Sequence, residues 1–273
     1  MKKHSQRLAA RNKPEPRDRG QTENGVERPR TVLPTPGDTT PHHAKKNAST
    51  AILDAPAPAP VFVFDEKTHR YTINGRDVPS VTDVFYDLGM LDDILAIGKE
   101  RLEQKRQIGQ AAHKATVLDD RGVLVLSSVD RRVLPYLNAW RRFRVEHHVR
   151  PIRHEQAMFS TVNRLAGTVD FIGVMDGVLA VIEKKTTAEL HPCVPLQLAA
   201  YSLLAEAHLP ELLREAGIRW TAEDRLHRYV VKLEPDSTYK LQPFTDPRDR
   251  LYFLNALSSV HWKWNNGLRR ARR

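Results

Sequence analysis

The 273-residue chain has a single cysteine, Cys193. A lone cysteine excludes an intramolecular disulfide, and it excludes any site built on four cysteines, whether a zinc site or an iron–sulphur cluster. The sequence has no run of 18 or more apolar residues, and no apolar segment follows its basic N-terminus. We therefore expect neither a membrane span nor a secretory signal, and a cytoplasmic location is the default expectation.

Several loops that bind nucleotides or build esterase sites are also missing. The sequence contains no Gly-x-x-x-x-Gly-Lys-Ser/Thr loop, no Gly-x-Gly-x-x-Gly, no Gly-x-Ser-x-Gly and no internal repeat. Because the first of these loops holds the phosphates of ATP, any ATP-driven work would need a separate motor protein.

Residues 1–60 lack Phe, Tyr and Trp and are rich in Lys, Arg, Pro, Asn and Thr. Such a segment buries too little apolar surface to offset the entropy of ordering, so we expect a disordered basic arm that ends in a Pro-rich linker. The arm has 11 Lys and Arg against 6 Asp and Glu, which accounts for half of the formal net charge of +10. A solubilising tail and a DNA-binding arm both stay open. Residues 266–273 form a second, short basic tail.

A hairpin over residues 167–186 is the clearest local signal. Two β-branched apolar runs flank Asp176-Gly177, a dipeptide that favours a two-residue type I′ turn. The register set by this turn places Asp170 opposite Glu183, with Cβ atoms roughly 5 Å apart. Like charges at that separation destabilise a sheet, so we expect a positive charge between them.

The alternation of side chains along the second strand adds a lysine to this pair. Lys185 lies on the same face as Glu183, whereas Lys184 points to the other face. One face of the hairpin would therefore offer Asp170, Glu183 and Lys185. Oxygen ligands of this kind suit a hard cation such as Mg²⁺, which takes one or two carboxylates plus water and substrate phosphate.

Asp170, a spacer of twelve residues and then Glu183-Lys184-Lys185 resemble the D-x(n)-(D/E)-x-K signature of the PD-(D/E)XK nuclease superfamily. This resemblance implies a metal-dependent DNA nuclease in which Asp170, Glu183 and Lys185 are catalytic. It implies Mg²⁺ as the cofactor, with Mn²⁺ as an alternative. In relatives the main-chain carbonyl of the residue at Lys184 is a further metal ligand, and its side chain has no implied role.

Further motifs resemble the RecB-like exonuclease branch of that superfamily, of phage and prophage type. They are Gln197-x-x-x-Tyr201, Gly109-x-x-x-His113 and the lead-in sequence Val-Pro-Ser-Val-Thr at 78–82. The resemblance implies that Gln197 and Tyr201 line the DNA groove and support the site. It also implies the metal ligands His113, Asp170 and Glu183, although Asp is commoner than Glu at the last position in this branch. A structural histidine and a plain Gln-Tyr packing face are the alternatives.

The same resemblance implies a restriction-endonuclease-like α/β core over residues 61–265, with a central mixed sheet flanked by helices. Hydrophobic periodicity and turn residues predict matching elements. Strands are expected at 61–64, 70–73, 151–160, 228–233 and 239–244, and helices at 92–118, 130–147, 195–207 and 246–264. Glu155 resembles an acidic residue that many members carry on the strand before the hairpin, with an exposed strand glutamate as the alternative.

The expected partner is DNA, and an exonuclease in recombination, repair or phage DNA processing is favoured over an endonuclease. A separate helicase or recombination protein would supply any motor function. One alternative is a DNA-binding accessory protein that keeps the fold without turnover, which predicts binding without metal-dependent cleavage. Another is a purely structural salt-bridge cluster, which predicts that added metal leaves thermal stability unchanged.

Overall fold

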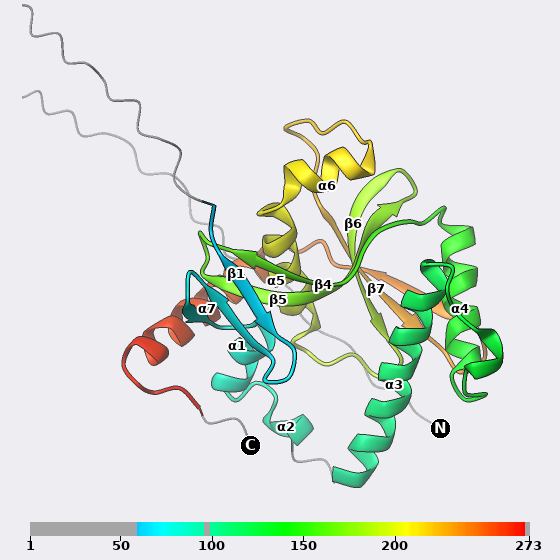
Figure 1. The fold of residues 1–273 in the computed structure, drawn as a ribbon, viewed down its shortest axis with the longest axis horizontal. Coiled ribbons are helices and arrows are strands. Elements are labelled where there is room, and N and C mark those ends of the chain that lie inside the picture. The colour runs from blue at the N-terminus through cyan, green and yellow to red at the C-terminus, as the bar shows by residue number, and fades with distance from the viewer. Residues whose placement is uncertain (1–58, 96–98, 271–273) are drawn as a thin grey trace, which may run out of the picture. The chain divides into compact units, whose positions relative to one another are not determined.

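Residues 59–95 and 99–270 are described in a computed structural model of the chain (Figure 1). The predicted basic arm lies outside the described residues except for its last two, and so do residues 271–273 of the predicted basic tail. No helix within the described ranges has both the length and the apolar character that a membrane crossing requires.

A five-stranded mixed sheet forms the centre of the fold (Figure 1). Its strands, in spatial order, are β4 (Arg150–Ser160), β5 (Leu165–Met175), β6 (Val178–Lys185), β7 (His227–Leu233) and β8 (Tyr239–Pro243). Neighbours are antiparallel except β6 and β7, which are parallel. The helices are α1 (Val81–Asp87), α2 (Asp92–Leu95), α3 (Lys99–Asp120), α4 (Leu134–Glu146), α5 (Val194–Glu206), α6 (Leu209–Ala216) and α7 (Arg248–Asn265), with a short 3₁₀ turn at Leu126–Ser128. The predicted α/β class with a central mixed sheet is confirmed.

The β5–β6 hairpin has the turn that the sequence predicts. Asp176 and Gly177 have φ values of 48° and 86°, as a type I′ turn requires. Strand pairing then follows the predicted register as far as Phe171 and Ile182. The ladder ends there, so the hairpin is confirmed but Asp170 falls just beyond its last pair.

Helices cover both faces of the sheet. On one face Ile172 and Val181 pack in a cluster with Leu198 of α5, and α7 lies beside α5. On the other face Phe171 and Ile182 belong to a cluster that includes Trp140 of α4. Helices α3 and α4 lie side by side (Figure 1). This two-sided burial holds the middle of the hairpin rigidly, since buried apolar contacts on both faces resist local opening.

Two predicted helices differ from the structure at their N-terminal ends. The helix expected over 130–147 begins at Leu134, because Pro135 occupies its first turn, where a missing N–H costs nothing. The stretch expected over 92–118 contains the short helix α2 and the separate helix α3.

A second, three-stranded sheet precedes the main one. It consists of β1 (Phe62–Asp65), β2 (Arg70–Ile73) and β3 (Arg76–Val78), all antiparallel. The chain then enters α1 through the predicted capping box. The Ser80 hydroxyl accepts a hydrogen bond from the main-chain N–H of Asp83, and the Asp83 carboxylate accepts one from the N–H of Ser80.

Replacing Ser80 with Ala should remove this cap and lower the free energy of unfolding by about 1 kcal/mol. For a domain of this size the melting temperature should fall by about 2–4 °C. Thr82→Ala on the exposed side of the same helix is the matched control and should melt like the wild type. Thermal unfolding of the three proteins checks this, and equal melting temperatures for S80A and T82A would show that the cap contributes nothing.

Candidate active site

Three acidic residues lie at one level across β4, β5 and β6. The pairs on either side of Glu155 place it opposite Asp170, and the hairpin register places Asp170 opposite Glu183. Glu155 has φ of 45°, a left-handed conformation that is uncommon for a residue with a side chain. Asp170 belongs to neither ladder, and the His113 side chain contacts its carboxylate from outside the sheet.

Helix α3 brings His113 to this break in the sheet. The imidazole Nδ1 lies 3.3 Å from Asp170 Oδ1 and 3.3 Å from Glu155 Oε1. The other ring nitrogen, Nε2, lies 3.0 Å from the main-chain oxygen of Lys184. The sequence alone left open whether His113 reaches Asp170, and the structure brings the two into contact.

Gly109 explains why α3 can approach so closely. A Cβ at this position would lie 3.3 Å from the Thr186 hydroxyl, which is tighter than most real contacts. The glycine stands one helical turn before His113, so it lets the helix come close to the end of β6 where the histidine makes its contacts.

The charges of Asp170 and His113 depend on each other. Burial by itself would raise the pKa of Asp170, but the His113 imidazolium and the Lys184 ammonium hold this pKa well below its usual value. Burial likewise opposes the charged form of His113, yet the Asp170 carboxylate raises the pKa of the imidazole to about 10. The metal-free protein therefore holds a protonated histidine, and a metal ion bound to His113 would release this proton.

Glu183 and Lys185 form a second group on the face covered by α5. The Lys185 ammonium lies 2.7 Å from Glu183 Oε1. The Gln197 side-chain amide donates to the same oxygen at 3.2 Å and to the Tyr201 hydroxyl at 2.9 Å. Burial disfavours the charge of Lys185, but Glu183 raises the pKa of this lysine. Burial, with Glu183 adding to it, raises the pKa of the Tyr201 phenol well above 10, so Tyr201 stays neutral.

The structure therefore divides the predicted site residues into two adjoining groups. His113, Glu155 and Asp170 each offer a ligand atom, and these atoms lie within 4.8 Å of one another. Glu183 is not in that group and is paired with Lys185 instead. Each of the two central carboxylates thus has its own cation, whereas the sequence predicted a single shared face.

The structure gives the Lys184 side chain a role in the site that the sequence does not predict. The Lys184 side chain, which the family resemblance leaves without a role, is fully buried, with its ammonium 3.0 Å from Asp170 Oδ1. The signal that could have indicated this is a lysine inside an otherwise apolar, buried strand, because a buried lysine requires a partner.

The donor atoms fit a hard divalent cation. An octahedral Mg²⁺ with bonds of about 2.1 Å places its ligand atoms about 3–4 Å apart, close to the spacing of the His113, Glu155 and Asp170 atoms. Glu183 Oε2 is buried and lacks a hydrogen-bond partner within the described ranges, which is the state expected of an oxygen that awaits a ligand. The carboxylate oxygens of Asp170, Glu155 and Glu183 suit Mg²⁺ or Mn²⁺, whereas the His113 nitrogen is a softer donor than Mg²⁺ usually takes.

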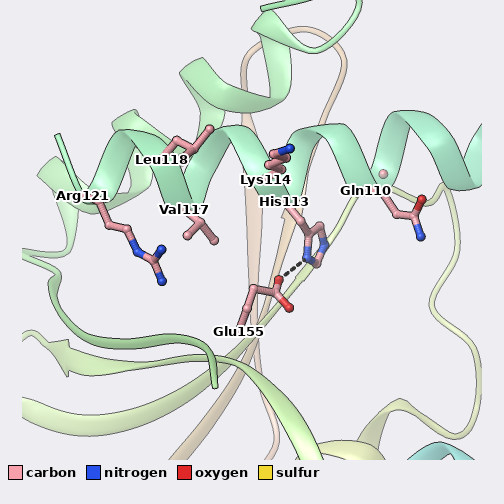
Figure 2. A pocket seen from close by; sticks show the side chains of 8 residues that line it. Gln110, His113, Lys114, Val117, Leu118, Arg121 and Glu155 are labelled. Atoms are coloured by element: carbon pink, nitrogen blue, oxygen red, sulfur yellow. Dashed lines mark hydrogen bonds and ion pairs between the residues drawn. The ribbon is translucent and has the colours of Figure 1, made fainter. Parts of the chain in front are cut away.

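A hollow of about 460 Å³ opens beside the first group, between α3 and β4 (Figure 2). His113 extends from α3 toward Glu155, Val117 of the same helix supplies an apolar wall, and Arg121 lies just past the end of the helix (Figure 2). Lys114 and Arg121 are exposed or partly exposed, and neither forms an ion pair with another described residue. The candidate metal ligands thus adjoin an open, positively charged cleft.

A mixed sheet that carries Asp170 and Glu183 at one level, with Lys185 two residues further along β6, fits the restriction-endonuclease-like class of α/β folds. The chain is a member of the PD-(D/E)XK nuclease superfamily, whose family model matches residues 90–252. This membership supports a nuclease-type hydrolytic function on DNA, with a divalent metal as cofactor. No curated protein matches the chain at a significant level.

Proposed function

We propose that this protein is a Mg²⁺-dependent deoxyribonuclease of the RecB-like branch, with Mn²⁺ as an alternative metal. The observation that carries the proposal is the convergence of His113, Asp170 and Glu155 beside the Glu183–Lys185 pair. Metal ligands and a positive charge are the two elements that phosphodiester hydrolysis needs at the scissile phosphate.

In this proposal His113, Asp170 and Glu183 hold the metal, and Glu155 completes the group. The main-chain oxygen of Lys184 lies beside His113 and is available as a further ligand. A bound divalent ion supplies charge stabilisation for the phosphate and lowers the pKa of water. The water oxygen bonds to phosphorus as a phosphorus–oxygen ester bond breaks, which leaves a hydroxyl and a phosphate monoester.

Lys185 has the role of orienting the attacking water or stabilising the negative charge that develops on the phosphate. Although burial disfavours its charge, Glu183 raises the pKa of Lys185, which favours the ammonium form, and an ammonium donates hydrogen bonds to water or phosphate. The Gln197 side-chain amide donates a hydrogen bond to Glu183 Oε1 and leaves Oε2 free. The same amide donates to the Tyr201 hydroxyl, which fixes the orientation of Gln197. Both act by positioning Glu183.

The hollow between α3 and β4 is the proposed path of the DNA backbone. Its unpaired cations are Lys114, which lies on the same helix as His113, and Arg121, which follows the end of that helix, so phosphates next to the scissile position would meet them. Removing either should weaken DNA binding and reduce the slope of log affinity against log salt by about 1, because one phosphate contact is lost.

Fluorescence anisotropy with labelled DNA, in EDTA so that no cleavage occurs, measures this slope. Arg142→Ala is the matched control, because Arg142 is an exposed arginine already paired with Glu146 on α4. We expect Lys114→Ala and Arg121→Ala to change the slope and Arg142→Ala to leave it unchanged. Equal slopes for all three variants would exclude this hollow as the path of the backbone.

The finer proposal is an exonuclease that serves recombination, repair or phage DNA processing, with a separate helicase or recombination protein as partner. Incubation with linear and closed circular DNA, in Mg²⁺, Mn²⁺ or EDTA, tests it. We expect metal-dependent loss of the linear DNA with survival of the circles. Cleaved circles would make the enzyme an endonuclease. DNA binding without cleavage in either metal would instead support a non-catalytic accessory protein.

A further inference from the structure

Lys184 stands out because its side chain is fully buried although it carries an ammonium group. The Nζ atom lies 3.0 Å from Asp170 Oδ1 and 3.1 Å from the Thr116 hydroxyl on α3. It also lies 5.2 Å from the centre of the Trp140 ring on α4, within the range of a cation–π contact. Two helices and a strand thus enclose this charge, and it has no open route to water.

Lys184 holds the Asp170 carboxylate by both oxygens. Its main-chain N–H donates to Oδ2 at 2.7 Å, while its ammonium contacts Oδ1. The two contacts come from one residue, so they fix the orientation of the carboxylate as a bidentate clamp does. The same Oδ1 also faces His113, which makes it the atom best placed to bind a metal ion.

The contact between Lys184 and Asp170 also neutralises one of the carboxylates of the site. Glu155, Asp170 and Glu183 meet at one level of the sheet, and two of these carboxylates are buried. Lys185 neutralises Glu183, and Lys184 neutralises Asp170. Because Lys184 is enclosed by Thr116 and Trp140, its charge stays next to Asp170 when a metal ion arrives, and the two cations repel each other.

We propose that Lys184 is a resident counter-ion, a positioning residue that fixes Asp170 in the metal-free protein and weakens the affinity of the site for a free divalent ion. The proposal rests on the proposed function, since it assumes the metal site at Asp170. It follows that the negative phosphate of the substrate offsets the repulsion, so the metal binds more tightly together with DNA than alone.

Calorimetric titration with Mn²⁺ of the wild type and of Lys184→Met tests the counter-ion role without any activity readout. Methionine keeps most of the length of the side chain and removes its charge. We expect the variant to bind Mn²⁺ at least about tenfold more tightly, because the repulsion is gone. A purely structural lysine predicts a lower melting temperature with an unchanged dissociation constant. Unchanged or weaker binding would overturn the inference.

A double-mutant cycle keeps the proposal testable if Lys184→Met is too unstable for titration. Asp170→Asn leaves the buried Lys184 without its carboxylate partner, and Lys184→Met leaves Asp170 with only His113 as a cation, whereas the double variant removes both charges of the Lys184–Asp170 pair. The double variant should therefore melt at a higher temperature than either single variant. If it melts below both, Lys184 is held by Thr116 and Trp140 and not by Asp170, and the inference is wrong.

The two proposals can fail separately. If neither the wild type nor Lys184→Met binds Mn²⁺, the proposed metal site is wrong, and the inference that rests on it is overturned too. If the wild type binds Mn²⁺ and Lys184→Met binds it no more tightly, only the resident counter-ion is rejected.

Discussion

Replacing Lys185 with Met is expected to slow DNA cleavage by roughly 100- to 1,000-fold, the usual loss when one charge-stabilising donor is removed from an active site. The Lys185 ammonium lies 2.7 Å from Glu183 and is the cation on the α5 face of the site. Lys184 cannot take its place, because its ammonium is enclosed on the other side against Thr116. Steady-state cleavage of a labelled DNA in Mg²⁺ measures the loss.

Lys232→Met is the matched control for this variant. Lys232 lies next to Lys185 in the parallel pairing of β6 and β7, but its ammonium is bonded to Glu234. We expect this control to cleave DNA at the wild-type rate. Full activity of Lys185→Met in Mg²⁺ would show that the reaction is not carried out at this hairpin.

Replacing Asp170 with Asn should have two large effects. Cleavage should be lost because a central metal ligand becomes neutral. The metal-free protein should also lose about 3–5 kcal/mol of stability, because the buried Lys184 ammonium would lose the carboxylate that balances its charge. The sequence alone predicts loss of cleavage with an intact fold, and the buried Lys184 adds the loss of stability.

Asp176→Asn is the matched control on the same hairpin. Asp176 lies in the exposed turn, and its carboxylate is hydrogen-bonded only to the side chains of His147 and His148 among the described residues. Cleavage assays and urea unfolding of the two variants check both effects. If Asp170→Asn cleaved DNA normally, or lost no more stability than Asp176→Asn, this account of Asp170 would be contradicted.

The hairpin could be predicted because its determinants are local. Asp176-Gly177 sets the turn type, the turn sets the register, and the register fixes which residues share a level. The contact of His113 with Asp170 joins segments far apart in the chain, so no local rule gives it. The order of the motifs along the chain suggests this contact. Gly109 makes it possible, because it lets α3 approach the end of β6 closely.

The details around Asp170 could not be predicted by simple alternation. Glu155 takes a left-handed conformation, and a register shift occurs earlier in β4, so the regular alternation of faces breaks down there. Alternation correctly sends the Lys184 side chain to the opposite face from Lys185. It does not show that the irregular strand lets the Asp170 carboxylate reach Lys184 and His113.

The most direct test of the central claim is to locate Mn²⁺ by anomalous scattering in crystals grown with this ion. We expect a peak within bonding distance of His113 and Asp170, with Glu183 Oε2 or Glu155 among the other ligands. The same peak should be missing from Asp170→Asn crystals. A peak elsewhere, or none at this hairpin in the wild type, would contradict the proposal that these residues form a metal-dependent nuclease site.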